Sequence, residues 1–263
     1  MKKYIQIICF VLLFIIINRA TYLLINYTSF NEENKTYISK IIFGTIISSY
    51  SIYAIRYFRF NYLVGISRPS FSYLWLYLCP LYIIFLLDLS NLSNFKSYEL
   101  ILPFTGVFLH AFAEELTIRG IILPTLINNG HITEKSVKKS VIISALIFGL
   151  VHFISFADYD LGSVLAQITY ATIHGLFFGV LLIKGRNIYL LALCHALINF
   201  FNRIKHINQP SFEPLDTGNS QSILLTILLT ILLFSPLIVI SIYYIKKIGT
   251  SDITRIKEFL SVK

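Results

Sequence analysis

The sequence predicts an all-α polytopic membrane protein with about eight transmembrane helices. Two features of its composition predict this class: 56% of the 263 residues are hydrophobic and only 13% are charged, against about 25% charged in an ordinary soluble domain. The third observation is that apolar runs of about 20 residues, the length that spans a bilayer as a helix, recur along the chain. We therefore expect a single transmembrane domain over residues 1–263, surrounded by lipid in the cell membrane.

The expected helices follow the apolar runs in chain order. The first run continues past Arg19 without a cleavage site, which favours a retained helix over a signal peptide. Pro80 is expected to kink the third helix, and a basic amphipathic tail follows the last. The expected helices span residues 4–26, 38–57, 71–89, 101–127, 139–157, 162–183, 187–203 and 221–245. Polar links separate them, including Arg68-Pro69-Ser70, Asn128-Asn129-Gly130, Asp158-Tyr159-Asp160, Lys184-Gly185-Arg186 and a stretch with Pro210 and Pro214.

The basic residues indicate how the chain is oriented in the membrane. Lys and Arg gather at alternate links, for example at Lys184 and Arg186 and again at Lys246 and Lys247. Such an excess is typical of the cytoplasmic side, so we expect both termini to be cytoplasmic. Arg203 and Lys205, on the last outer link, are the exceptions. Because topology explains the basic residues, the net charge of +9 does not indicate a nucleic-acid partner.

The fourth run, residues 101–127, carries two carboxylates and an arginine in an apolar setting. An ionised group at the centre of a bilayer costs at least about 2.5–3.5 kcal/mol on insertion scales, so a chain keeps one that has a partner or a function. Glu115 and Arg119 are four residues apart, which predicts an ion pair that needs no further partner. Glu114 points about 100° away, and its i−4 neighbour is His110. We therefore predict that Glu115 has a structural and electrostatic role and that Glu114 faces the reaction cavity.

Histidines on two later runs are candidate partners for Glu114. His152 follows Phe148 by one helical turn on the fifth run, and Asn199 follows His195 by one turn on the seventh. Polar groups on separate spans with no other intramembrane partner are expected to converge in one cavity. We therefore predict that catalytic residues come from helices 4, 5 and 7.

Together, these patterns resemble the signature of the CPBP family, the CAAX-protease and bacteriocin-processing (Abi) intramembrane proteases. The patterns are Glu114-Glu115-x-x-x-Arg119, Phe148-x-x-x-His152 and His195-x-x-x-Asn199, in that order, with a family-like core over about 99–205. The resemblance implies an intramembrane endopeptidase that hydrolyses a peptide bond in a membrane-associated peptide or protein. In a bacterium, the expected substrate is a bacteriocin or pheromone precursor.

The resemblance also implies a role for each residue. Glu114 would act as general base on water with the help of His152, while His195 and Asn199 would donate hydrogen bonds to the oxyanion. Supporting residues would be Glu115, Arg119 and Phe148, with Arg119 anchoring Glu115.

The residues leave a metal mechanism open. Glu114, His152 and His195, with His110 as a further candidate, are enough for a three-ligand zinc site with an open position. No H-E-x-x-H pair lies on one helix, and a metal-bound Glu114 would leave the base role to another group. We therefore favour a glutamic-type mechanism without a cofactor, with a Zn²⁺-dependent metalloprotease as the alternative.

Two other functions are weighed against the protease. A membrane immunity or scaffolding protein would bind a peptide without cleaving it, but a binder has no need for Glu114 and His152 together. A small transporter would use Glu114 and Arg119 for proton coupling, but the internal repeat expected of one is not found in the sequence. Because family members are associated with bacteriocin immunity, the immunity protein stays the main alternative.

Overall fold

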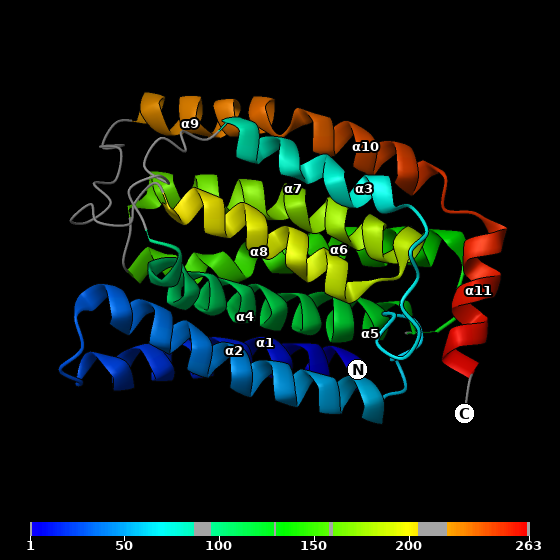
Figure 1. Ribbon diagram of the computed structural model, residues 1–263. Helices are drawn as coiled ribbons and strands as arrows, with labels where there is room; N and C mark the ends of the chain where they lie inside the picture. The colour runs from blue at the N-terminus through cyan, green and yellow to red at the C-terminus, as the bar shows by residue number, and fades with distance from the viewer. Residues whose placement is uncertain (1, 87–95, 129, 158–159, 205–219, 262–263) are drawn as a thin grey trace.

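The computed structural model describes residues 2–86, 96–128, 130–157, 160–204 and 220–261, and every regular element in these ranges is a helix. The predicted all-α class is therefore confirmed. Most helices lie side by side in one stack, and α11 lies across one end of it (Figure 1). The start of α1 lies toward the same end of the stack as α11.

The helices follow the predicted apolar runs, and each run contains at least one of them. One further helix, α11, forms where the sequence predicts an amphipathic tail. The elements are α1 (Lys2–Asn26), α2 (Glu32–Tyr57), α3 (Leu74–Leu78), η1 (Cys79–Leu86), η3 (Ser97–Leu100), α4 (Ile101–Thr117), η4 (Ile118–Ile122), α5 (Leu123–Ile127), α6 (Glu134–Val151), η5 (His152–Ala157), α7 (Leu161–Gly185), α8 (Ile188–Ile204), α9 (Ser220–Leu233), α10 (Ser235–Lys246) and α11 (Thr250–Ser261).

Within these ranges, five helices are long and apolar enough to cross a membrane, or six if a bent pair counts as one span. The bent pair, α9 and α10, turns by 57° where Pro236 starts the second helix. The third and seventh predicted spans are helical but short, at Leu74–Leu86 and Ile188–Ile204. A membrane crossing typically needs about 17 to 25 residues. Leu74–Leu86 is shorter than this and Ile188–Ile204 only reaches the lower limit, so the predicted number of eight spans is not confirmed.

Some sequence predictions fall on residues outside the described ranges. These are the end of the third helix at 87–89, Asn129 in the turn, Asp158-Tyr159, and the polar stretch with Pro210 and Pro214. At Pro80, where a kink is predicted, the α-helix α3 has already given way to the tighter 3-10 helix η1.

Glycines set the close packing of α2 against α4. A Cβ atom on Gly44 would lie 2.6 Å from the backbone carbonyl of Leu109, a distance that real Cβ contacts essentially never show. A Cβ atom on Gly106 would lie 3.0 Å from the carbonyl oxygen of Tyr37. Leu109 immediately precedes His110 in α4. The contact at Gly44 therefore holds α2 beside the turn of α4 that carries His110.

The C-terminal helix α11 is fastened to the end of α7 by buried charges. Lys184 Nζ lies 2.6 Å from Asp252 Oδ2 and donates a hydrogen bond to the carbonyl oxygen of Lys247 at 2.9 Å. Arg255 donates to Asp252 Oδ1 at 3.0 Å and to the carbonyl oxygen of Ile183 at 2.6 Å. Lys184, predicted only as part of a basic topology signal, lies in the last turn of α7 and therefore also anchors the C-terminal helix.

Candidate active site

The two adjacent carboxylates lie near the end of α4, just before a π-helical turn. The turn, η4, covers Ile118–Ile122 and therefore contains Arg119. The N–H of Ile118 points to the carbonyl oxygens of both Glu114 and Glu115. Such turns change the angular register of the helix and are frequent at functional sites. The sequence predicts one continuous helix over 101–127, because nothing in an apolar run marks a π turn.

Glu115 is fully buried and accepts two hydrogen bonds on one oxygen. Arg119 Nη1 lies 3.0 Å from Oε1, which is the ion pair that the i,i+4 spacing predicts. His195 Nδ1, from α8, lies 2.8 Å from the same Oε1. The expectation that Glu115 needs no partner but Arg119 is therefore wrong. Because an ionised carboxylate only accepts hydrogen bonds, His195 carries a proton on Nδ1.

Arg119 is enclosed by aromatic rings as well as by its carboxylate. Its guanidinium carbon lies 4.3 Å from the centre of the Phe148 ring and 5.7 Å from that of Phe178. The side chain is fully buried, and within the described ranges its Nε and Nη2 atoms have no hydrogen-bond partner. Cation–π attraction and the Glu115 pair are thus the main interactions that stabilise this charge inside the protein.

Glu114 faces a different set of groups. Its side chain is 9% exposed, with Oε1 3.4 Å from His110 Nε2 and Oε2 3.6 Å from His195 Nε2. His195 therefore lies between the two carboxylates, with Nδ1 on Glu115 and Nε2 toward Glu114. The i,i+4 neighbour His110 is the closest imidazole to Glu114 that the structure gives.

His152 lies where α6 ends and the 3-10 helix η5 begins. Its Nδ1 donates to the carbonyl oxygen of Phe148 at 2.8 Å, so its Nε2 is the nitrogen left for other partners. The ring of Phe148 stands edge-on to the imidazoles of both His152, at 5.0 Å, and His195, at 6.0 Å. His152 is half-buried and lies within electrostatic range of Glu114. Phe148 is thus the common neighbour of two histidines and of Arg119.

Two other polar residues of the predicted spans differ in their surroundings. Asn199 is half-buried and lies one turn beyond His195 on α8. His174, on α7, binds the carbonyl oxygen of Tyr170 through Nδ1 at 3.1 Å, and its ring lies 5.0 Å from that of Phe234. These contacts give His174 a packing role between α7 and the break that joins α9 to α10.

The side chains do not form the three-ligand zinc site that the sequence leaves open. In the part of the chain that the structure describes, no group of three or more His, Cys, Asp or Glu residues is arranged to hold a metal ion. His195 bonds Glu115 through Nδ1 and His152 bonds a backbone carbonyl through Nδ1, so Nε2 of each ring takes no part in these two bonds.

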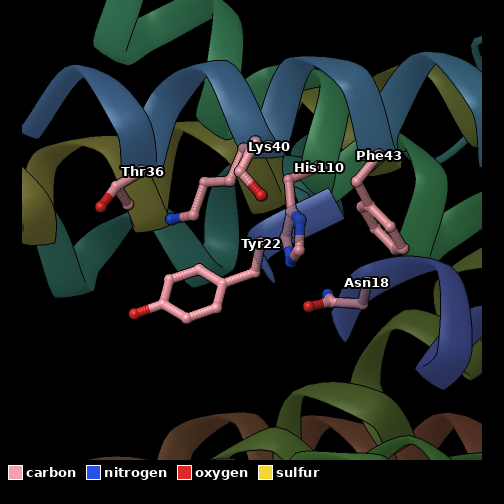
Figure 2. Close-up of a pocket in the computed structure, with 7 residues that line it drawn as sticks. Asn18, Tyr22, Thr36, Lys40, Phe43 and His110 are labelled. Carbon is pink, nitrogen blue, oxygen red and sulfur yellow. The ribbon is translucent and has the colours of Figure 1, made fainter. Parts of the chain in front are cut away.

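A pocket of about 90 Å³ lies beside His110, between α1, α2 and α4 (Figure 2). Its lining residues are Asn18, Tyr22, Thr36, Ser39, Lys40, Phe43 and His110. His110 therefore belongs both to this pocket and to the surroundings of Glu114. Sequence reasoning missed the pocket, although one signal was present: Lys40 is a charged residue inside the second apolar run.

Comparison with known proteins identifies the central segment. Residues 96–201 match the family model of the Rce1-like type II CAAX prenyl endopeptidases. The match contains all the predicted catalytic residues, Glu114, His152, His195 and Asn199, and it confirms the resemblance to the CAAX-protease family. No curated protein and no solved structure matches the chain.

Proposed function

We infer that this chain, whose residues 96–201 belong to the Rce1-like CAAX protease family, is an intramembrane endopeptidase. The family match supports protease activity, and the long apolar helices support a place in the membrane. The observation that carries the proposal is that His195 lies between two buried carboxylates, 2.8 Å from Glu115 and 3.6 Å from Glu114. A protein that only binds a peptide has no need for such an acid–base arrangement.

Glu114 is the proposed general base. Its contacts with His110 and His195, at 3.4 and 3.6 Å, are longer than ordinary hydrogen bonds of about 2.7–3.2 Å, so its oxygens can accept a shorter bond from a water molecule. Glu114 would take a proton from this water as the oxygen attacks the peptide carbonyl, and would pass the proton to the leaving amine. His152, within electrostatic range of Glu114, is the proposed assistant in this step.

His195 is the proposed oxyanion donor, and Glu115 prepares it for that role. With one proton on Nδ1, a neutral His195 would present Nε2 as an acceptor, so donation to the oxyanion requires the imidazolium form. Glu115 would stabilise this form and fix the ring, as the aspartate does in a Ser-His-Asp triad. Arg119 would keep Glu115 ionised and in place, and Asn199 would supply the second donor.

The proposed substrate is a membrane-associated peptide or protein, with a bacteriocin or pheromone precursor as the bacterial case. The family description refers to prenylated proteins, so a prenylated peptide belongs among the probes. Both termini are proposed to lie in the cytoplasm. The alternation of basic links supports this, as do the positions of α11 and the start of α1 toward one end of the stack.

The test is to reconstitute the full chain in liposomes with a mixture of membrane-anchored peptides, with and without a prenylated cysteine. Mass spectrometry then detects new peptide termini. We expect the wild-type protein to produce them and the variants Glu114→Gln, His152→Ala and His195→Ala to produce none. A matched control, His131→Ala, changes an exposed histidine before α6 and should cleave normally. Peptide binding without cleavage by the wild-type protein would instead indicate the immunity or scaffolding protein.

A further inference from the structure

We propose that three arginines at one end of the helix stack bind the phosphate of an anionic membrane lipid. Arg68 lies in the loop after α2, Arg186 follows the last residue of α7, and Arg255 lies on α11. None of the three is among the proposed catalytic residues. The proposal goes beyond the proposed peptidase function, because it concerns a lipid site and does not depend on peptide cleavage.

The loop after α2 packs directly on the end of α7. The backbone N–H of Ser70, two residues after Arg68, donates to the carbonyl oxygen of Arg186 at 3.1 Å. The side-chain amide of Asn187 donates to the carbonyl oxygen of Ser70, also at 3.1 Å. Gly65 lies so close that a Cβ atom on it would collide with the carbonyl oxygen of Arg186. These contacts hold the backbone that carries Arg68 beside Arg186.

Helix α11 contacts the same end of α7. The guanidinium carbon of Arg186 lies 4.2 Å from the centre of the Phe259 ring. Arg255 Nη2 donates to the carbonyl oxygen of Ile183, in the last turn of α7, at 2.6 Å. Figure 1 shows α11 and the loop after α2 at the same end of the stack. Three arginines from separate parts of the sequence therefore gather around the end of α7.

The positive charge of this cluster is not balanced. Asp252 is shared by two cations, Lys184 at 2.6 Å and Arg255 at 3.0 Å. Within the described ranges, Arg68 and Arg186 form no ion pair, and the guanidinium of each lies instead over an aromatic ring. The cluster thus has fewer carboxylates in contact than cations, and a phosphate would supply the missing negative charge.

The charges near Arg186 repel it. Burial lowers the pKa of Arg186, and the positive charges of Arg255 and Arg68 lower it further. Glu258, the other carboxylate of α11, is exposed and forms no ion pair with these arginines in the part of the chain that the structure describes. A bound anion would relieve the repulsion among the three guanidinium groups.

The backbone of Arg186 is also unusual. Arg186 is the C-cap of α7 and has the left-handed conformation, with φ 48° and ψ 54°. Glycine is the usual residue in this conformation at a helix end, because a Cβ atom makes it unfavourable. Residues held in such sparsely populated conformations cluster at ligand sites. An arginine at this position therefore indicates that its side chain has a use.

The cluster lies at the level where lipid phosphates are found. The apolar span of α7 ends at Gly185, so Arg186 is the first residue beyond it. Exposed Tyr73 and Trp75, at the start of α3, lie 6.3 and 6.1 Å from Tyr244, near the end of α10. Such aromatic groups are typical of the membrane–water interface. Guanidinium groups there can bind a phosphate through two parallel hydrogen bonds, and basic pockets at the ends of spans bind anionic head groups.

The experiment measures lipid binding to the full chain in a neutral detergent. The protein is titrated with short-chain phosphatidylglycerol or phosphatidylcholine, and native mass spectrometry gives the Kd of each lipid. Wild-type protein should bind phosphatidylglycerol more tightly. Arg68→Gln and Arg186→Gln should each raise the Kd for phosphatidylglycerol by about 5-fold, the effect of one basic residue beside an anionic lipid, and leave that for phosphatidylcholine unchanged. The matched control Arg56→Gln removes an exposed arginine from the last turn of α2 and should change neither Kd.

Three results would overturn the proposal. Equal Kd values for the two lipids in wild-type protein would show that no phosphate site discriminates between them, a comparison that needs no variant. Equal weakening by Arg56→Gln and Arg68→Gln, both changes of exposed side chains, would indicate diffuse attraction to basic residues rather than a site. Displacement of phosphatidylglycerol by an equal concentration of inorganic phosphate would indicate a site for a soluble anion. No peptide is used, so a failure of the proposed peptidase function would not affect these results.

Discussion

Replacing Glu115 with Gln is expected to destabilise the protein and to stop catalysis, for two separate reasons. Glu115 is fully buried, and its Oε1 accepts hydrogen bonds from Arg119 at 3.0 Å and His195 at 2.8 Å. Gln keeps the shape of the side chain and removes its charge. Arg119 then stays fully buried without its ion-pair partner, and His195 loses the carboxylate that orients it.

The size of both effects follows from these contacts. Leaving one member of a buried ion pair without its partner typically costs about 3–5 kcal/mol of the free energy of unfolding. A domain has only about 5–15 kcal/mol, so the loss should be easy to measure. The hydrolysis rate should fall on the order of 10⁴-fold, as it does when the carboxylate behind a catalytic histidine becomes an amide.

A double variant separates the two effects. Glu115→Gln with Arg119→Met removes both charges, and replacing a buried pair as a whole is often neutral or stabilising. Thermal unfolding in detergent should therefore show recovered stability, while the hydrolysis rate in liposomes stays low because His195 still lacks its carboxylate. Full activity in Glu115→Gln, or a double variant that regains activity together with stability, would refute the positioning role of Glu115.

Further predictions test the packing, the mechanism and the C-terminal helix. Gly44→Ala should lower both the unfolding midpoint and the hydrolysis rate, because its Cβ would lie 2.6 Å from the backbone of Leu109; Gly249→Ala, whose nearest atoms would be 4.0 Å away, should change neither. Treatment with EDTA and 1,10-phenanthroline should leave the hydrolysis rate unchanged, and a loss that only zinc restores would establish a metal mechanism. Asp252→Leu should lower the free energy of unfolding by about 3–5 kcal/mol, measured by thermal unfolding. The reason is that buried Lys184 would lose its carboxylate partner, which lies 2.6 Å away in the wild-type protein. An unchanged midpoint would show that this pair does not hold α11.

Contacts within one helix could be predicted from the sequence, but contacts between helices could not. The Glu115–Arg119 pair and the approach of His110 to Glu114 both follow from an i,i+4 spacing. The bond between His195 and Glu115 depends on how α8 is rotated against α4. No local pattern encodes that rotation, so the sequence predicted the approach of His195 to Glu114, now seen at 3.6 Å, but missed its bond to Glu115.

Local departures from the regular α-helix were also hidden from the sequence. The apolar run 101–127 does not reveal the π turn at Ile118–Ile122, and the fifth run does not reveal that His152 starts a 3-10 helix. The third and seventh runs are helical, but their apolar composition could not tell a full membrane crossing from a shorter helix. Composition together with the recurring apolar runs of about 20 residues was sufficient for the all-α class.

We propose that Glu114 is the general base in the hydrolysis of a peptide bond. The test is to measure the single-turnover rate of product formation by wild-type protein and by Glu114→Gln in the same type of liposome. The two proteins are first shown to have equal unfolding midpoints, so that a difference in rate does not come from misfolding. A general base typically contributes on the order of 10²–10⁴-fold, so the rate of Glu114→Gln should fall by at least about 10²-fold. Equal rates for the two proteins would show that Glu114 is not the general base.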